Sequence, residues 1–404
     1  TLGVLNRVMK VDLGIPLLVV TPILAAYNLA APAAVWIGAR SDRHAFRGLH
    51  RTPYILGGAV LMAIGTLAAP FVAWLLAGRV DLLSIGLAIV VFAVMGVGMY
   101  GSGATYFALL SEAVSVGRER AVAVVYSMLM AGILAGVALS AYVLPHYTPG
   151  ALLTLHTVVA LVIVVCTWWA VRGAEGRDAP VTTAPTMGLR SFLRGSQPRR
   201  FFVFMVALTF FAFLQQGILE PFGGDVFGLS VRTTTSFNAI QIGGVLLGMA
   251  VAARALSPAI GRRATTGVGM VIAAVGFSAL AVSGIERSDG LLYLGIAVMG
   301  LGLGVLNVGS LSLMLDMTAG HAAGLAMGLW TVAHAIADGA ATASGGVLQT
   351  LIGSIVGTDA GAYAGVFVIE ALGLLAVLGL LRRIDPERFK QEFNKVTTLE
   401  GGTT

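Results

Sequence analysis

The feature that most constrains this chain is a series of apolar runs, each long enough to cross a lipid bilayer as a helix. A spanning helix needs about 20 mainly apolar residues, because lipid leaves the backbone no other hydrogen-bond partners. Only 11% of the residues are charged, against about 25% in soluble domains. The sequence therefore predicts an all-α membrane protein. Its eleven predicted spans are 15–38, 53–76, 82–111, 121–144, 150–171, 201–222, 236–256, 265–285, 290–315, 322–352 and 361–381.

Lysine and arginine are distributed unevenly among the connections, and this predicts the orientation in the membrane. Of the 25 basic residues, 20 lie in one alternating set of connections or after residue 381. That set is 39–52, 113–120, 172–200 and 254–264. We expect it, and the C-terminus, to be cytoplasmic. Eleven spans then place residue 11 outside, so residues 1–10 are predicted to end an earlier, twelfth helix that is incomplete in this chain.

A long connection with six arginines and three prolines divides the chain near its middle. We predict an N-terminal helix bundle at 1–172, a cytoplasmic linker at 173–200, a C-terminal bundle at 201–383 and a cytoplasmic tail at 384–404. An internal repeat supports two halves, because the run Ala93–Gly98 matches Ala297–Gly302 at an offset of 204 residues. Two similar halves in parallel orientation predict the major facilitator fold, with twelve transmembrane helices in two pseudo-symmetric six-helix halves.

The glycines of this repeat include Gly96, Gly98 and Gly101, which fit a G-x-G-x-x-G pattern. A dinucleotide site needs a preceding strand and a βαβ unit, and the sequence offers neither. We interpret these glycines as points where helix backbones approach closely, and Gly300, Gly302 and Gly304 in the same way.

The connection after the first predicted span contains Gly38, Asp42, Arg43 and Arg51. It resembles the signature loop of the major facilitator superfamily. An aspartate at a helix end can pair with an arginine on a neighbouring helix end and hold one state of a gate. The alternative is that the arginines only anchor the loop on the cytoplasmic side.

Ionisable residues inside predicted spans are the main candidates for function, because keeping them in lipid is costly. His334 and Asp338 lie four residues apart on one helix face, and Glu370 lies halfway along the last span. They are candidates for a proton relay, for polar ligand contacts or, in His334, for ligation of a pigment magnesium. His156 is a second possible axial ligand. The alternative for each is a hydrogen bond that fixes helix packing.

Other classes of function find no support in the sequence. The net charge of +6 is small and dispersed, which argues against a nucleic-acid partner. We find no catalytic residue set and no clustered metal ligands, so we expect a protein that is not an enzyme and holds no metal of its own.

The run 214–231 is the most specific motif in the chain. It contains Glu220, Pro221, Gly223, Gly224 and Asp225 within Leu-Glu-Pro-Phe-Gly-Gly-Asp-Val-Phe-Gly-Leu-Ser-Val. This run resembles the signature of PucC- and LhaA-type light-harvesting assembly proteins, the bacteriochlorophyll-delivery branch of the major facilitator superfamily.

Further stretches resemble the same family over almost the whole chain. They are Leu5–Met9 with Asp12–Gly14, Ser41-Asp42 with Arg51–Ile55, Met314–Thr318 with Gly324–Trp330, and Pro386–Phe389. Phe222 stands where tyrosine is commoner in the family, and His50 replaces the first arginine of the loop pattern.

The resemblance implies an assembly factor for photosynthetic antenna or reaction-centre complexes in a bacterial inner membrane, cytoplasmic or intracytoplasmic. It would deliver bacteriochlorophyll or chlorophyll, bound transiently, or chaperone antenna helices. Its partners would be light-harvesting subunits, the reaction centre, pigment-synthesis enzymes and membrane lipids, with the Glu220–Asp225 run as a docking element. Two alternatives stay open: a proton-coupled transporter of a small solute, and a structural subunit that stays in a photosynthetic complex.

Overall fold

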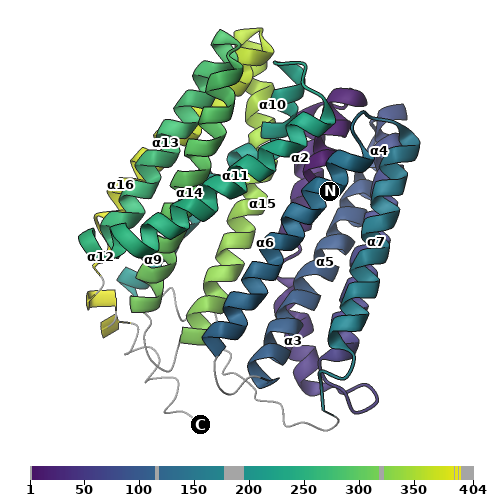
Figure 1. Cartoon of the computed structure of the whole chain (residues 1–404), viewed down its shortest axis with the longest axis vertical. Helices are drawn as coiled ribbons and strands as arrows, with labels where there is room; N and C mark the ends of the chain where they lie inside the picture. Colours follow the sequence, from purple (N-terminus) through teal and green to yellow (C-terminus); the bar gives the residue numbers. More distant parts are fainter. Residues whose placement is uncertain are drawn as a thin grey trace. The chain divides into compact units, whose positions relative to one another are not determined.

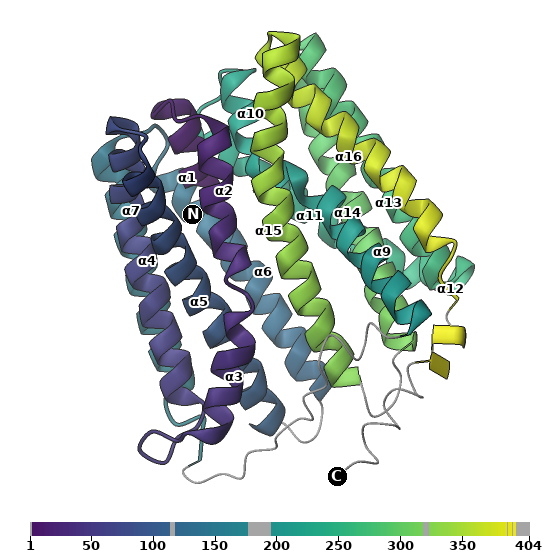
Figure 2. The ribbon, with the colours of Figure 1, turned by 180° about the vertical axis from the view of Figure 1, so that it is seen from behind.

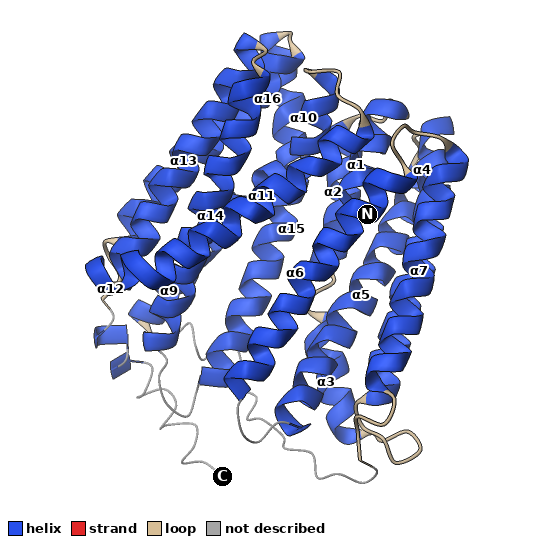
Figure 3. Ribbon diagram, viewed as in Figure 1, coloured by secondary structure: helices blue, strands red, loops and turns tan. Residues whose placement is uncertain are grey.

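The computed structural model describes residues 2–113, 118–176, 195–317, 323–385, 387–389 and 391–392. Within these ranges, side chains are described except at 35, 39, 42, 111–113, 118–127, 129–130, 314–317 and 323–332. The described elements are all helices, as Figure 3 shows. They belong to two compact units, and each unit is described by itself.

Unit 1 comprises residues 1–184 together with 229–236. Its long helices α4, α5 and α7 pack side by side, with α2 and α3 against α5 (Figures 1 and 2). The elements are α1 (Leu2–Arg7), the π-helix η1 (Val8–Asp12), α2 (Leu17–Leu29), α3 (Ala33–Arg43), α4 (Thr52–Gly78), α5 (Leu82–Ala113), α6 (Arg118–Val143) and α7 (Pro149–Val171).

Unit 2 comprises residues 185–228 together with 237–404. Here α13 packs between α14 and α16, and α15 packs against α9 and α16 (Figures 1 and 2). The elements are α9 (Ser196–Phe213), the 3-10 helix η2 (Leu214–Gly217), α10 (Leu219–Asp225), α11 (Val231–Val251), the π-helix η3 (Ala252–Leu256), α12 (Ser257–Ile260), α13 (Arg262–Glu286), α14 (Asp289–Met317), α15 (Ala323–Val356) and α16 (Asp359–Leu381). Of α11, the part from Phe237 onward belongs to this unit.

Among the described residues, nine helices are long and apolar enough to cross a membrane. They confirm nine of the eleven predicted runs. The run predicted at 15–38 is instead two helices, α2 and α3, separated at 30–32. Pro32 explains the break, because proline has no backbone N–H to donate and clashes with the preceding turn. Of the run at 121–144, the described apolar part is the shorter helix Ala131–Val143.

The repeated glycines bring helix backbones into contact, as predicted. A β-carbon built on Gly98 would lie 2.5 Å from the carbonyl oxygen of Gly58 on α4, and one on Gly96 would overlap the Tyr27 carbonyl on α2. In the second copy, a β-carbon on Gly300 would lie 2.5 Å from the Gln241 carbonyl oxygen on α11. The 204-residue offset therefore relates equivalent packing contacts within the two units.

The chain divides between the units in a way that differs from the predicted boundaries. The units part at residues 184 and 185, inside the predicted linker, and α9 already begins at Ser196. Residues 229–236, predicted to belong to the C-terminal bundle, associate with unit 1. Two bonds hold this segment there: Arg7 donates to the Leu229 carbonyl oxygen at 2.9 Å, and Arg232 donates to that of Ala141 at 3.1 Å.

Candidate functional site

The predicted span 201–222 is interrupted in its second half. α9 ends at Phe213, and η2 leads to a new helix, α10, at Leu219. Proline explains the interruption, because the ring of Pro221 would clash with the carbonyl of residue 217 in a continuous helix. In α10, Pro221 occupies the first turn, where its missing N–H needs no partner. The break leaves backbone groups that other helices must satisfy.

Glu370 of α16 satisfies one of these groups. Its Oε1 accepts a hydrogen bond from the backbone N–H of Gln215 at 2.7 Å. With its amide in the orientation that suits its neighbours, the Gln215 side chain also donates to that oxygen, at 3.0 Å. Glu370 is 0% exposed, and its Oε2 has no hydrogen-bond partner among the described residues. A buried carboxylate at a helix break is typical of a functional position in membrane proteins.

His334 of α15 contacts the same interrupted span. Its Nδ1 lies 3.0 Å from Thr209 Oγ1 on α9, and its ring meets Phe213 edge-on with centroids 5.4 Å apart. Thr209 therefore helps to fix the orientation of the imidazole. Asp338 lies one turn further along α15 and is half-buried. His334 and Glu370 therefore both contact the interrupted span, His334 at Thr209 and Glu370 at Gln215.

The family run 219–225 forms the helix α10. Both glycines lie inside α10, and the turn follows it, where Gly228 has φ +66°. Glu220 is held by a neighbouring side chain, because Asn238 Nδ2 donates to its Oε1 at 2.7 Å. Asp225 Oδ2 accepts from the Tyr363 hydroxyl at 2.7 Å. Glu220 is only 6% exposed, so these contacts fix α10 within unit 2, and partner docking by the run stays a prediction.

The second pigment-ligand candidate, His156, lies on α7 in unit 1. Its ring is 2% exposed, and its Nδ1 lies 2.9 Å from the Leu152 carbonyl oxygen. A pigment macrocycle needs an open approach to the ligating nitrogen, and this packing offers none. His334, which is half-buried, is the better candidate.

The signature loop is held by contacts that the sequence did not reveal. The side chain of Asp42 lies outside the described residues, so its predicted pairing stays a prediction. A β-carbon built on Gly38 would meet nothing within 4 Å, and Arg43 is exposed. Arg51 is buried, and its guanidinium donates to Ser41 Oγ at 2.6 Å.

Glu175, which follows α7, binds the start of α4. Its Oε1 accepts backbone N–H bonds from His50 and Arg51 at 2.6 and 2.8 Å, and its Oε2 accepts one from Thr52 at 2.7 Å. We call this arrangement the Glu175 clasp. Partial burial raises the pKa of Glu175, but the hydrogen bonds from the Thr52, Arg51 and His50 backbone outweigh it and leave the pKa below its usual value.

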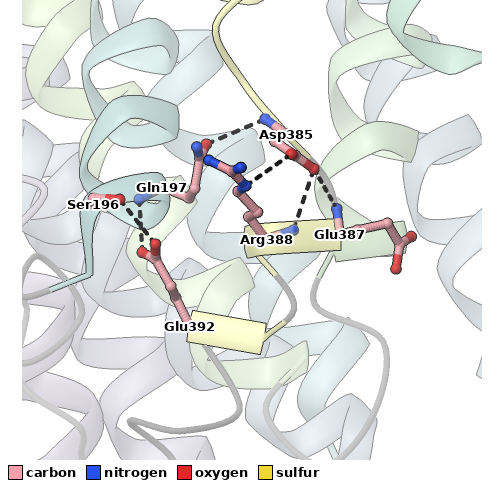
Figure 4. Close-up of polar contacts among 6 residues, drawn as sticks. All are labelled: Ser196, Gln197, Asp385, Glu387, Arg388 and Glu392. Carbon is pink, nitrogen blue, oxygen red and sulfur yellow. Dashed lines mark hydrogen bonds and ion pairs between the residues drawn. The ribbon is translucent and has the colours of Figure 1, made fainter.

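In unit 2 a second carboxylate binds the start of α9 (Figure 4). Glu392 accepts from Ser196 Oγ and from the Gln197 backbone N–H, both at 2.8 Å. Gln197 Oε1 accepts in turn from the Asp385 backbone N–H at 3.2 Å. The fully buried Phe389 packs edge-on against Phe201, with ring centroids 5.7 Å apart. The chain after α16, which includes the family stretch ending at Phe389, therefore packs against α9, the first described helix of unit 2.

Sequence reasoning missed Glu175, Gln215, Thr209 and Asn238. Glu175, Gln215 and Thr209 contact partners 123 to 155 residues away in the chain, and Asn238 contacts a side chain 18 residues away across the turn after α10. The one available signal was Pro221, which indicates a break in the span but not what satisfies it.

Comparison with known proteins gives the chain a clear set of relatives. The family model described as PUCC protein matches residues 4–389. Protein PucC of Rhodobacter capsulatus is 30% identical over 398 residues, covering 93% of this chain and 86% of the relative. The bacteriochlorophyll synthase 44.5 kDa chain of Rhodobacter capsulatus is 32% identical over 414 residues, covering 95% and 92%.

Among solved structures, the nucleoside transporter NupG has a TM-score of 0.70 to this chain. The similarity covers 95% of this chain and 94% of the transporter, at 15% sequence identity. A bacterial homologue of the iron transporter ferroportin, in an inward-facing state, gives a TM-score of 0.67. At this identity the likeness shows the fold alone, and it confirms the predicted all-α major facilitator fold.

Proposed function

This chain belongs to the PucC protein family, and from that membership we propose that it is an assembly factor for photosynthetic antenna and reaction-centre complexes. It delivers bacteriochlorophyll or chlorophyll to these complexes, or chaperones their antenna helices within the membrane. The observation that carries the proposal is the family match across 4–389, because it extends through both units. The fold by itself is compatible with many functions.

The proposal treats the protein as a carrier or chaperone rather than an enzyme. The solved structures it resembles are transporters, whereas one relative is named a bacteriochlorophyll synthase chain. The transporter-like fold and the name of this relative are both compatible with a protein that delivers pigment to other subunits without changing it chemically. The remaining alternative in a photosynthetic membrane is that the protein stays in a finished photosynthetic complex as a structural subunit.

The proposal places the protein in a bacterial inner membrane, cytoplasmic or intracytoplasmic, as a multi-pass protein with a cytoplasmic C-terminus. Nine candidate spans among the described residues establish the multi-pass character. The basic residues of alternating connections support the orientation. Light-harvesting subunits, the reaction centre and pigment-synthesis enzymes would meet it within or beside this membrane.

A specific observation favours proton-coupled solute transport as the second candidate function. Glu370 is buried beside a helix break, and neither α15 nor α16 contains a lysine or arginine to neutralise it. Carboxylates in such positions carry protons or coupling ions in transporters. The family match, however, supports pigment handling, and nothing in the contacts of Glu370 specifies a solute.

The pigment candidate fits the donor chemistry of His334. Neutral imidazole is a good axial ligand for magnesium in a chlorin, and the Thr209 contact fixes the ring as supporting contacts do at metal sites. The bound pigment would be the molecule that is delivered, and its light absorption would report that it is present. The residues of this chain would bind and orient it, with Phe213 against the imidazole edge.

The first prediction is that gently purified wild-type protein carries a near-infrared pigment band, and that His334→Leu removes or shifts it. The reason is the loss of the imidazole, because leucine offers no nitrogen to magnesium. Spectra are compared at equal amounts of folded protein, and co-purified light-harvesting subunits are identified by mass spectrometry. His146→Leu, which changes an exposed histidine, is the matched control.

An unchanged band in His334→Leu removes this histidine from the pigment site. A wild-type protein that never carries pigment but retains antenna subunits favours helix chaperoning. A protein that carries neither, but takes up a solute with protons, contradicts the proposed function.

A further inference from the structure

A cavity of about 230 Å³ lies in unit 1 where α7 ends and α4 begins. Its apolar wall is formed by Leu49, Leu56 and Val171, and its polar side by Arg172 and Glu175. The rest of the lining comes from Thr52, Trp168 and Gly173. The cavity is separate from the interrupted span of unit 2, and the proposed function leaves it unused.

The two charged groups of the cavity differ in what they can offer to a ligand. Both carboxylate oxygens of Glu175 already accept backbone hydrogen bonds in the clasp. The Arg172 guanidinium lies 5.1 Å from the centre of the Trp168 ring, and it forms no ion pair with any residue the structure describes. Stacking on an aromatic face positions a guanidinium without using its N–H donors. Among the described residues, no hydrogen bond or ion pair occupies the N–H donors of the Arg172 guanidinium, so the ligand of this cavity would be an anion.

The cavity adjoins the end of a candidate membrane span. Arg172 directly follows the candidate span Pro149–Val171. Trp168 and Trp169 are 49% and 77% exposed, as is typical of tryptophans at the boundary between lipid tails and water. By the distribution of basic residues, this end of the span is the predicted cytoplasmic end, where anionic lipids are concentrated.

The size of the cavity limits the occupant. Sites for drug-sized molecules measure about 300–1,000 Å³, so a volume of about 230 Å³ suits a headgroup rather than a pigment macrocycle. The apolar wall beside the guanidinium suits a molecule that is anionic at one end and apolar at the other. Basic pockets at the cytoplasmic ends of spans bind lipid headgroups in this way.

We propose that this cavity is a binding site for the phosphate headgroup of an anionic phospholipid, with the Arg172 guanidinium, stacked on Trp168, as its main ligand. Planar guanidinium groups bind phosphate through two parallel N–H donors. The lipid's upper acyl chain lies along Leu56 and Val171. Because the cavity borders the Glu175 clasp, the bound lipid also stabilises the junction between α7 and α4. This proposal does not depend on the proposed function.

The test measures lipid binding to the purified full chain by native mass spectrometry and by melting temperature. Phosphatidylglycerol is compared with phosphatidylcholine, and inorganic phosphate is tested alone. We expect a preference for phosphatidylglycerol that weakens about tenfold in Arg172→Gln, as loss of a charge-assisted contact implies. Arg199→Gln is the control, since it removes an exposed arginine from the same predicted face of the membrane.

Arg172→Lys serves as a second variant should the glutamine variant fold poorly. It keeps the charge but loses the planar fork, so we expect an intermediate affinity. Equal phosphatidylglycerol binding by wild type and by a folded Arg172 variant would overturn the proposal, as would a wild type that does not distinguish the two lipids. If inorganic phosphate fully displaces phosphatidylglycerol, the ligand of Arg172 is a free anion rather than a lipid headgroup, and the proposal is overturned.

Discussion

Alanine at Gly58 is expected to destabilise unit 1 by about 1–3 kcal/mol, the usual cost of overpacking a close contact. A β-carbon at Gly58 would lie 2.7 Å from the carbonyl oxygen of Gly98 and 2.8 Å from the β-carbon of Ser102. The first of these neighbours is backbone, which can move only if α4 and α5 separate. The control is the adjacent Gly57, where a β-carbon would meet nothing within 4 Å. Gly57→Ala should be neutral or stabilise the helix by about 0.5–1 kcal/mol.

The measurement is thermal unfolding of both variants in the same detergent, followed by circular dichroism. Unit 2 offers a second adjacent pair, because a β-carbon at Gly244 would lie 2.6 Å from the Ala297 carbonyl oxygen, whereas one at Gly243 would meet nothing. Gly244→Ala should therefore melt lower than Gly243→Ala. Equal melting temperatures within both pairs would show that the helices are not packed as closely as the structure has them.

Removing the Glu175 carboxylate is expected to have the second largest effect. Glu175→Ala leaves the N–H groups of His50, Arg51 and Thr52 without the partner that binds all three. Loss of a side chain that satisfies helix N-terminal groups costs about 0.5–2 kcal/mol. We expect the upper part of that range, because the carboxylate is charged and lies at the positive end of the α4 dipole.

The clasp also predicts a pH dependence with a definite sign. The pKa of Glu175 is lower in the folded protein than the usual 4.5. The carboxylate therefore contributes its full stability above about pH 4.5 and loses it as the pH falls through the lower, folded-state pKa. Melting temperatures should fall over that window in the wild type, and less in Glu175→Gln. Glu286→Gln, at an exposed helix end, is the control and should follow the wild type. Parallel curves for wild type and Glu175→Gln would contradict the clasp.

Apolar runs and glycine spacing were enough to predict much of the fold. A spanning helix is determined by a local property, so nine runs were identified directly. The equivalence of Gly96 with Gly300, and of Gly98 with Gly302, followed from the repeat alone and corresponds to equivalent backbone contacts. Local breaks were harder, because Pro32 and Pro221 each interrupt a run whose hydropathy continues across them.

The polar contacts of the candidate site were beyond prediction for a physical reason. Glu175 binds backbone groups that are 123 to 125 residues away in the chain. Thr209, likewise, is 125 residues from His334. Composition indicates that a buried ionisable group needs a partner, but the partner depends on which helices become neighbours. The spacing of His334 and Asp338 suggested a shared helix face, but it gave no sign of Thr209, which lies on another helix.

The central claim is that this protein assembles photosynthetic complexes, and the most direct measurement is the near-infrared absorption of membranes from a strain that lacks its gene. The account predicts a large loss of antenna or reaction-centre bands per cell, while free pigment continues to be made. Restoring the wild-type gene should restore the bands, and restoring His334→Leu should do so less well than His146→Leu. Membranes with unchanged bands in the deletion strain would contradict the account.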